Sequence, residues 1–137
     1  MRIFIFDWSG TLNHLPDVKG YLTDLRVRNP GCYIVCNSGY AGYEIANQLG
    51  LSQLQPYFDM HCRKNTVREI FYGITKHRDS DWFIENPIPV KDVSEILIVD
   101  DEDYNSWAYE DLSEAWGIPF RLFNGHNPVE KMEEALK

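Results

Sequence analysis

Three hydrophobic segments of the chain each end in polar side chains that could act together chemically. These side chains are Asp7, the pair Asn37-Ser38, and the pair Asp100-Asp101. A carboxylate at the end of a buried segment costs free energy unless a cation or hydrogen-bond donors stabilise it. If the segments are neighbouring parallel strands, their carboxyl ends meet at one crevice, where the three carboxylates would repel one another. Mg²⁺ binds carboxylates, waters and phosphate oxygens, so this pattern predicts a magnesium site. The alternative is that these residues are three separate helix caps or surface acids.

The elements that would position these residues alternate between strands and helices. Strands are predicted at residues 2–6, 32–36, 96–99 and 120–123, with a short extended segment ending at 62. Helices are predicted at 17–28, 40–49, 65–74 and 108–115, and a last helix is expected to begin with Asn127 as its cap and Pro128 at its first position. Residues 79–94 are expected to be an irregular connection. This alternation indicates an α/β fold with a three-layer, doubly wound, mostly parallel sheet. We find no repeat or linker, and we expect a single domain over residues 1–137.

The composition and net charge argue against several classes of function. The chain has 137 residues, of which 44% are hydrophobic and 14% aromatic, so we expect a packed core. No window approaches the roughly 18 apolar residues of a membrane span, and we expect neither a span nor a signal peptide. Three cysteines suit a reducing compartment, which predicts a cytoplasmic location. The net charge of −8 argues against a broad nucleic-acid-binding face, and the basic residues at 26–28 and 63–68 are expected to be solvated.

The order of the polar motifs resembles that of the haloacid dehalogenase superfamily of phosphohydrolases, over residues 2 to about 124. The segment Asp7-Trp8-Ser9-Gly10-Thr11 is similar to the first motif of the family, D-x-D-x-T, after a hydrophobic strand. Ser38 matches the second motif, Lys64 after Tyr57-Phe58-Asp59 matches the third, and Asp100-Asp101 match the fourth. Receiver domains share the fold but place the acidic pair after the first strand, so the motif order here argues against a receiver.

The resemblance implies a role for each matched residue. Asp7 would be the nucleophile that forms an aspartyl-phosphate. Ser38 and Lys64 would bind the phosphoryl group, with Lys76 and Lys91 as alternatives for the lysine. The expected ligands of Mg²⁺ are Asp7, Asp100, Asp101 and the backbone carbonyl of Ser9. Further substrate contacts are expected from Trp8, Thr11 and Asn37, although Thr11 could instead order the loop and Trp8 could instead belong to the core.

Ser9 is the one departure from the first motif. Phosphatases of this family have a second aspartate there, which protonates the leaving oxygen, and a hydroxyl cannot replace it near neutral pH. The loss of a general acid costs a factor of roughly 10²–10⁴ in rate. We therefore expect either a slow phosphatase acting on a phosphate monoester or acyl phosphate, or a catalytically degenerate binding or regulatory module with the same fold. His14, in the loop after the motif, is a candidate substitute acid.

The spacing between the motifs leaves room for only a loop, single helices and a short strand. The family often covers its site with an inserted cap domain, and these short connections predict a member without one. An uncapped site would admit a large phosphorylated substrate, such as a phosphoprotein or the end of a nucleic acid.

Overall fold

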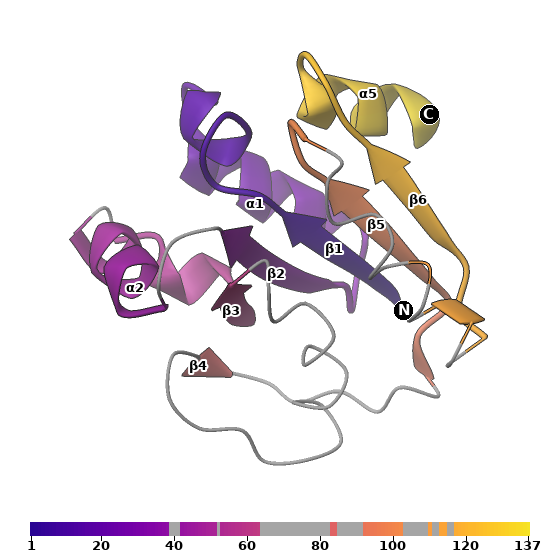
Figure 1. Ribbon diagram of the computed structural model, residues 1–137, viewed down its shortest axis with the longest axis horizontal. Helices are drawn as coiled ribbons and strands as arrows, with labels where there is room; N and C mark the ends of the chain where they lie inside the picture. Colours follow the sequence, from indigo (N-terminus) through magenta and orange to yellow (C-terminus); the bar gives the residue numbers. More distant parts are fainter. Residues whose placement is uncertain are drawn as a thin grey trace.

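The computed structural model describes residues 1–38, 42–51, 53–63, 83–84, 92–102, 110, 113–114 and 117–137. Its elements, shown in Figure 1, are β1 (Arg2–Phe6), η1 (Leu12–His14), α1 (Val18–Arg28), β2 (Tyr33–Ser38), α2 (Gly42–Leu51), η2 (Gln55–Tyr57), β3 (Met60–Arg63), β4 (Phe83–Ile84), β5 (Glu95–Val99), β6 (Phe120–Phe123) and α5 (Pro128–Ala135). The chain has an α/β fold, as predicted.

The strands form one sheet in the order β4-β3-β2-β1-β5-β6, with β1 near its centre. Every neighbouring pair from β3 to β6 is parallel, and only β4 runs antiparallel to its neighbour β3. The strand order reverses at β1, since β2 and β3 extend the sheet to one side and β5 and β6 to the other. Ligands of open α/β sheets bind outside the carboxyl ends of the strands at such a reversal. In this chain the reversal lies beside Asp7.

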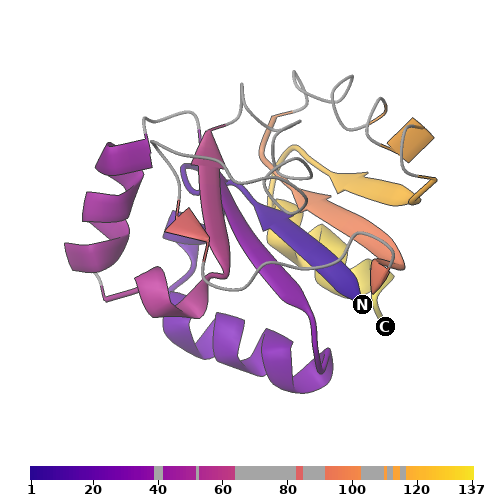
Figure 2. The ribbon, with the colours of Figure 1, turned by 90° about the horizontal axis from the view of Figure 1, so that it is seen from below.

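Alternate side chains of the central strands point to opposite faces of the sheet and build two hydrophobic clusters. Ile3 and Ile5 of β1 belong to one cluster, whereas Phe4 and Phe6 belong to the other. The second cluster includes residues from α1, α2 and α5, and these three helices lie on the same face of the sheet (Figures 1 and 2). The predicted helix at 65–74 lies outside the described residues, as does most of the predicted helix at 108–115, so the second helical layer stays a prediction.

Ends of the helices follow from local chemistry. Asp17 caps α1, because its side chain accepts a hydrogen bond from the backbone N–H of Gly20. Residues 110, 113 and 114 have helical backbone, and the backbone N–H of Gly117, at a φ of 66°, donates to the carbonyl of Ser113. This left-handed glycine follows the predicted helix at 108–115, a position where such a glycine is common.

Several predicted boundaries are wrong. Strand β2 continues through Ser38, because β3 pairs with its last residues and extends the ladder. Helix α2 passes through Gly50, and the left-handed residue that follows its end is Gln53, with a φ of 57°. The 79–94 segment contains β4, which pairs with β3 and is therefore not wholly irregular.

The expected cap of the last helix is also wrong in its chemistry. Asn127 does precede α5, but it has a left-handed backbone, with a φ of 51°, and its side chain makes no capping hydrogen bond. Pro128 occupies the start of the helix as predicted, since its missing N–H would have no intrahelical acceptor there.

Four arginine side chains make ion pairs: Arg2, Arg26, Arg28 and Arg121. Arg26 donates to Asp59, and Arg28 donates to both Asp24 and Glu133, so the basic segment at 26–28 does not form a groove for an anion. Near the amino ends of the strands, Glu95 of β5 accepts from Arg2 of β1 and from Arg121 of β6. None of the described helices has the length and apolar character needed to cross a membrane.

Candidate metal centre and adjoining cavity

The carboxyl ends of β1 and β5 place three aspartates side by side. Asp7 directly follows β1 and is 3% exposed, and Asp100 directly follows β5 and is 5% exposed. The backbone N–H of Asp7 donates to the carbonyl of Val99 at 2.8 Å, and that of Asp100 donates to the carbonyl of Phe123 at 3.0 Å. These bonds continue the sheet ladder past the ends of the strands. The backbone of both aspartates is therefore held by hydrogen bonds to the neighbouring strands.

The spacing of the carboxylates permits one shared cation. Asp7, Asp100 and Asp101 each offer an oxygen, and these oxygens all lie within 4.8 Å of one another. Opposite ligands of an octahedral Mg²⁺ are roughly 4 Å apart, because each Mg–O distance is about 2.0–2.1 Å. Small side-chain rotations would bring the three oxygens to one such ion. The donor set, which is all oxygen and strongly acidic, fits a hard divalent cation.

The loop after β1 closes tightly over this cluster. Gly10 has a φ of 74°, a conformation that few other residues adopt, and a Cβ atom there would collide with the Asp101 carboxylate. The backbone N–H of Gly10 donates to the Asn13 side chain at 2.9 Å, which fixes the turn. Glycine is therefore needed so that the backbone of the first motif can approach Asp101.

Two details show how the protein handles charge at this site. The Asp100 carboxylate accepts a hydrogen bond from the backbone N–H of Glu102 at 3.0 Å, which stabilises its ionised form. Beneath the cluster, burial raises the pKa of the Cys36 thiol, and the negative charge of Asp7 raises it further. Cys36 on β2 and Cys32 just before it are both buried free thiols.

The second motif lies in the neighbouring strand. Asn37 is 1% exposed within β2, so its amide belongs to the interior of the sheet. Ser38 is the last residue of β2 and pairs in register with Arg63, while its side chain lies outside what the structure describes. Lys64, the preferred phosphate-binding lysine, also lies outside the described residues, as do its alternatives Lys76 and Lys91. Their predicted roles stay predictions.

Of the remaining residues of the first motif, some pack against the hydrophobic core and others line a cavity. Trp8 is half-buried and packs against the hydrophobic cluster beneath the sheet, and Ser9 is half-buried in the turn. The loop is ordered by the backbone of Thr11, whose N–H donates to the carbonyl of Trp8 at 3.4 Å. The Thr11 side chain is 3% exposed, and its hydroxyl has no hydrogen-bond partner among the described residues.

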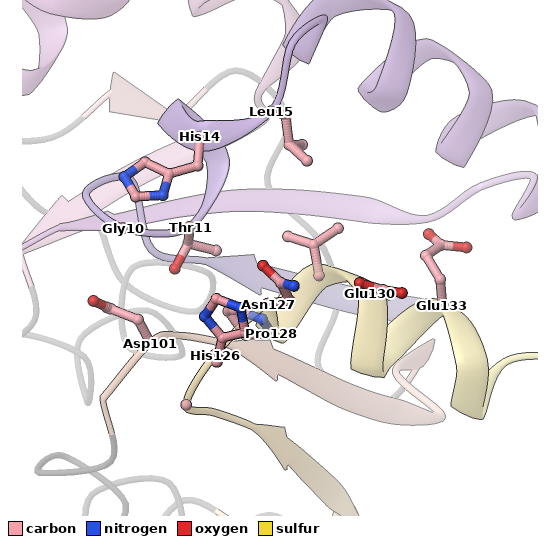
Figure 3. Close-up of a pocket in the computed structure, with 12 residues that line it drawn as sticks. Gly10, Thr11, His14, Leu15, Asp101, His126, Asn127, Pro128, Glu130 and Glu133 are labelled. Atoms are coloured by element: carbon pink, nitrogen blue, oxygen red, sulfur yellow. The ribbon is translucent and has the colours of Figure 1, made fainter.

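A cavity of about 750 Å³ adjoins the cluster, between the loop after β1 and the start of α5 (Figure 3). Gly10, Thr11 and Asp101 line the end nearest the aspartate cluster, and His14 also lines the cavity. The opposite wall comes from the segment after β6, which our sequence analysis did not connect with the site. Its members include His126, Glu130 and Glu133.

The sequence does contain a pattern that predicts this wall of the cavity. Polar residues 124–127 follow β6 just as Asp7 and Asp100 follow their strands, so they reach the same edge of the sheet. The backbone N–H of Gly125 donates to the carbonyl of Asp101 at 3.2 Å, which holds the two loops together. Comparison with family models, with curated proteins and with solved structures finds no match to this chain, so the four motifs and this geometry are the basis for assigning a function.

Proposed function

We propose that the chain is a Mg²⁺-dependent phosphohydrolase of the haloacid dehalogenase type, without a cap domain, that uses Asp7 as its nucleophile. The observation that carries this proposal is the meeting of Asp7, Asp100 and Asp101 at the carboxyl ends of β1 and β5, within 4.8 Å of one another. The motif order predicted this meeting from segments more than ninety residues apart in the sequence. Substrates are phosphate monoesters or acyl phosphates.

The chemistry assigned to the chain's own residues follows the resemblance of their motifs to the family. Asp7 attacks phosphorus, a bond forms between its carboxylate oxygen and phosphorus, and the bond to the leaving oxygen breaks. Water then attacks the aspartyl-phosphate, which releases phosphate and restores Asp7. Asp7, Asp100, Asp101 and the Ser9 carbonyl would hold Mg²⁺, which offsets the negative charge of the phosphoryl oxygens when it is bound. Ser38 and Lys64 contribute a hydrogen bond and a positive charge to the same oxygens.

Ser9 determines which leaving groups are favoured. Its hydroxyl does not supply a proton near neutral pH, so the reaction is slow unless the leaving oxygen departs readily as an anion. Acyl and aryl phosphates meet this condition better than alkyl phosphates do. The same residue supports a second candidate function, a binding or regulatory module that has kept the fold and the metal site but lost turnover.

Hydrolysis of acetyl phosphate and p-nitrophenyl phosphate distinguishes the two candidates. We expect turnover with Mg²⁺, none with EDTA, and a loss of about a thousandfold or more in Asp7→Asn, because the nucleophile is removed. The matched control is Asp24→Asn, which neutralises an exposed carboxylate on α1 and should leave turnover unchanged.

Metal binding without turnover in the wild-type chain would reject the enzyme and support the module. Equal turnover in Asp7→Asn and wild type would reject Asp7 as the nucleophile. In Ser9→Asp, restoring the carboxyl group should raise the hydrolysis of alkyl phosphates by roughly 10²-fold if the chain is an enzyme, and should have no effect on a module.

A further inference from the structure

The cavity beside the metal centre has a buried polar group that no part of the described chain satisfies. The hydroxyl of Thr11 lacks a hydrogen-bond partner, although its residue is 3% exposed. Figure 3 shows this hydroxyl directed toward the space between Asp101 and His126. A buried hydroxyl without a partner costs free energy that a ligand's polar group can recover. The Thr11 hydroxyl is therefore a buried donor beside the cavity that a small shift of the loop would bring to a ligand's polar atom.

From this end the cavity continues along α5. Figure 3 shows Asp101 and Thr11 at one end, Pro128 further along, and Glu130 with Glu133 at the other end. Leu15 and Val129 add apolar surface to its walls. An α-helix rises about 1.5 Å per residue, so the stretch from Pro128 to Glu133 spans roughly 7 Å. This length and the volume of about 750 Å³ suit a small organic molecule with an apolar body.

The far end of the cavity is acidic. Glu133 accepts hydrogen bonds from Arg28 and from the Tyr21 hydroxyl, each at 2.8 Å, so its charge is already compensated. Glu130 is exposed and has no ion-pair partner among the described residues. The nearby ammonium group of Lys131 donates to the carbonyl of Asn124 and does not line the cavity.

Neither lysine nor arginine lines the described walls of the cavity. An anionic leaving group would therefore meet carboxylates without a compensating cation, whereas an ammonium group would find Glu130 at the end of an apolar passage. Neutral polar groups could bond to the histidines but would gain no ion pair.

We propose that this cavity binds the leaving group of the phosphorylated substrate and selects one with an apolar body and a terminal ammonium group. This inference rests on the proposed phosphohydrolase function and specifies its substrate class. The phosphoryl group occupies the end at Asp7 and Asp101, the Thr11 hydroxyl bonds to a substrate oxygen, and the ammonium group pairs with Glu130.

Three aryl phosphates of nearly equal size test this selectivity. They are (aminoethyl)phenyl, (hydroxyethyl)phenyl and (carboxymethyl)phenyl phosphate, which carry a positive, a neutral and a negative group at the same distance from phosphorus. With Mg²⁺ present we expect kcat/KM for the ammonium compound to exceed that for the carboxylate compound by about tenfold. In Glu130→Gln this preference should fall by about threefold, mainly through KM, whereas Glu134→Gln, on the same helix but outside the cavity, should keep it.

A second readout does not depend on turnover. In NMR titrations of the Asp7→Asn protein with Mg²⁺, in which turnover is expected to be at least about a thousandfold slower, the ammonium compound should shift the amide signals of Gly10 and Gly125 at lower concentration than the carboxylate compound does. Equal kcat/KM values for the three compounds, with p-nitrophenyl phosphate still hydrolysed, would overturn the inference and leave the proposed function intact. Failure to hydrolyse any phosphate would overturn both.

Discussion

Two buried carboxylate sites in this chain are stabilised in different ways. Asp59, which is 7% exposed, accepts from the guanidinium of Arg26 and from the backbone N–H of Ile34, both at 2.9 Å. At the ends of β1 and β5, three carboxylates instead lie within 4.8 Å of one another. The cation beside Asp59 is the guanidinium of Arg26, and this ion pair joins α1 to the start of β3.

The difference separates a carboxylate paired with its own arginine from carboxylates that could share a metal ion. A carboxylate with its own arginine and backbone donor contributes to the stability of the fold, and its loss leaves a partly buried charge behind. Each carboxylate of the cluster repels the other two, and a bound divalent cation would offset that repulsion. A divalent cation should therefore change the stability that depends on the cluster and leave the contribution of the Asp59 site unchanged.

The largest expected effect tests the structural site. Asp59→Asn should lower the free energy of unfolding by about 2 to 3 kcal/mol, because Arg26 loses its partner in a partly buried position. Urea denaturation followed by circular dichroism measures this change. Asp24→Asn is the control, since its exposed pair with Arg28 is worth less than about 1 kcal/mol. Equal losses in both variants would show that Asp59 has no special structural role.

The next effect tests the metal centre. Mg²⁺ at about a hundredfold above its Kd should raise the free energy of unfolding of the wild type by about 2.7 kcal/mol, because the ion binds only the folded cluster. Asp101→Asn should lose most of this gain. Thermal denaturation with and without Mg²⁺ measures both quantities. A stabilisation by Mg²⁺ that is unchanged in Asp101→Asn would remove this residue from the metal site.

The smallest expected effect concerns the pKa of Cys36, which responds to burial and to the negative charge of Asp7. Burial and then Asp7 raise its pKa above the ordinary value of 9.0, so above that pH the thiol ionises in the unfolded chain and stays protonated in the folded one. The unfolded state then binds fewer protons, and the free energy of unfolding falls as pH rises, by at most about 1.4 kcal/mol per unit.

Denaturation curves between pH 8 and 10 measure this slope. It should be shallower in Cys36→Ala, which has no thiol to ionise, and below pH 8 neither chain should show a contribution from this group. Identical slopes in the two chains would mean that Cys36 is not held protonated by its surroundings.

Strong local patterns in the sequence predicted the centre of the fold. The run Ile96-Leu97-Ile98-Val99 and the run at residues 2–6 are continuous apolar segments, which suit strands covered on both faces, and the structure places them side by side. Because parallel neighbours end at the same edge, the meeting of Asp7 with Asp100 and Asp101 followed from the strand assignment.

Features that depend on tertiary contacts were not predicted. Strand β4 is two residues long and is defined by its pairing with β3, so no local pattern could reveal it. The sequence Asn127-Pro128 suggested a side-chain cap, but the left-handed backbone of Asn127 prevents the usual arrangement. The cavity wall on α5 depends on where β6 lies in the sheet, and its glutamates look like ordinary solvent-facing residues in the sequence.

The contacts of Glu95 with Arg2 and Arg121 lie at the edge of the sheet opposite the aspartate cluster. They link β1, β5 and β6 near their amino ends. A shift of β5 by one residue would break these contacts and would turn its apolar side chains to the wrong face. The contacts that fix the alignment of Asp7 beside Asp100 therefore lie at the other end of the strands, in side chains outside the aspartate cluster. Substitutions among the three clustered aspartates should consequently leave the strand alignment intact.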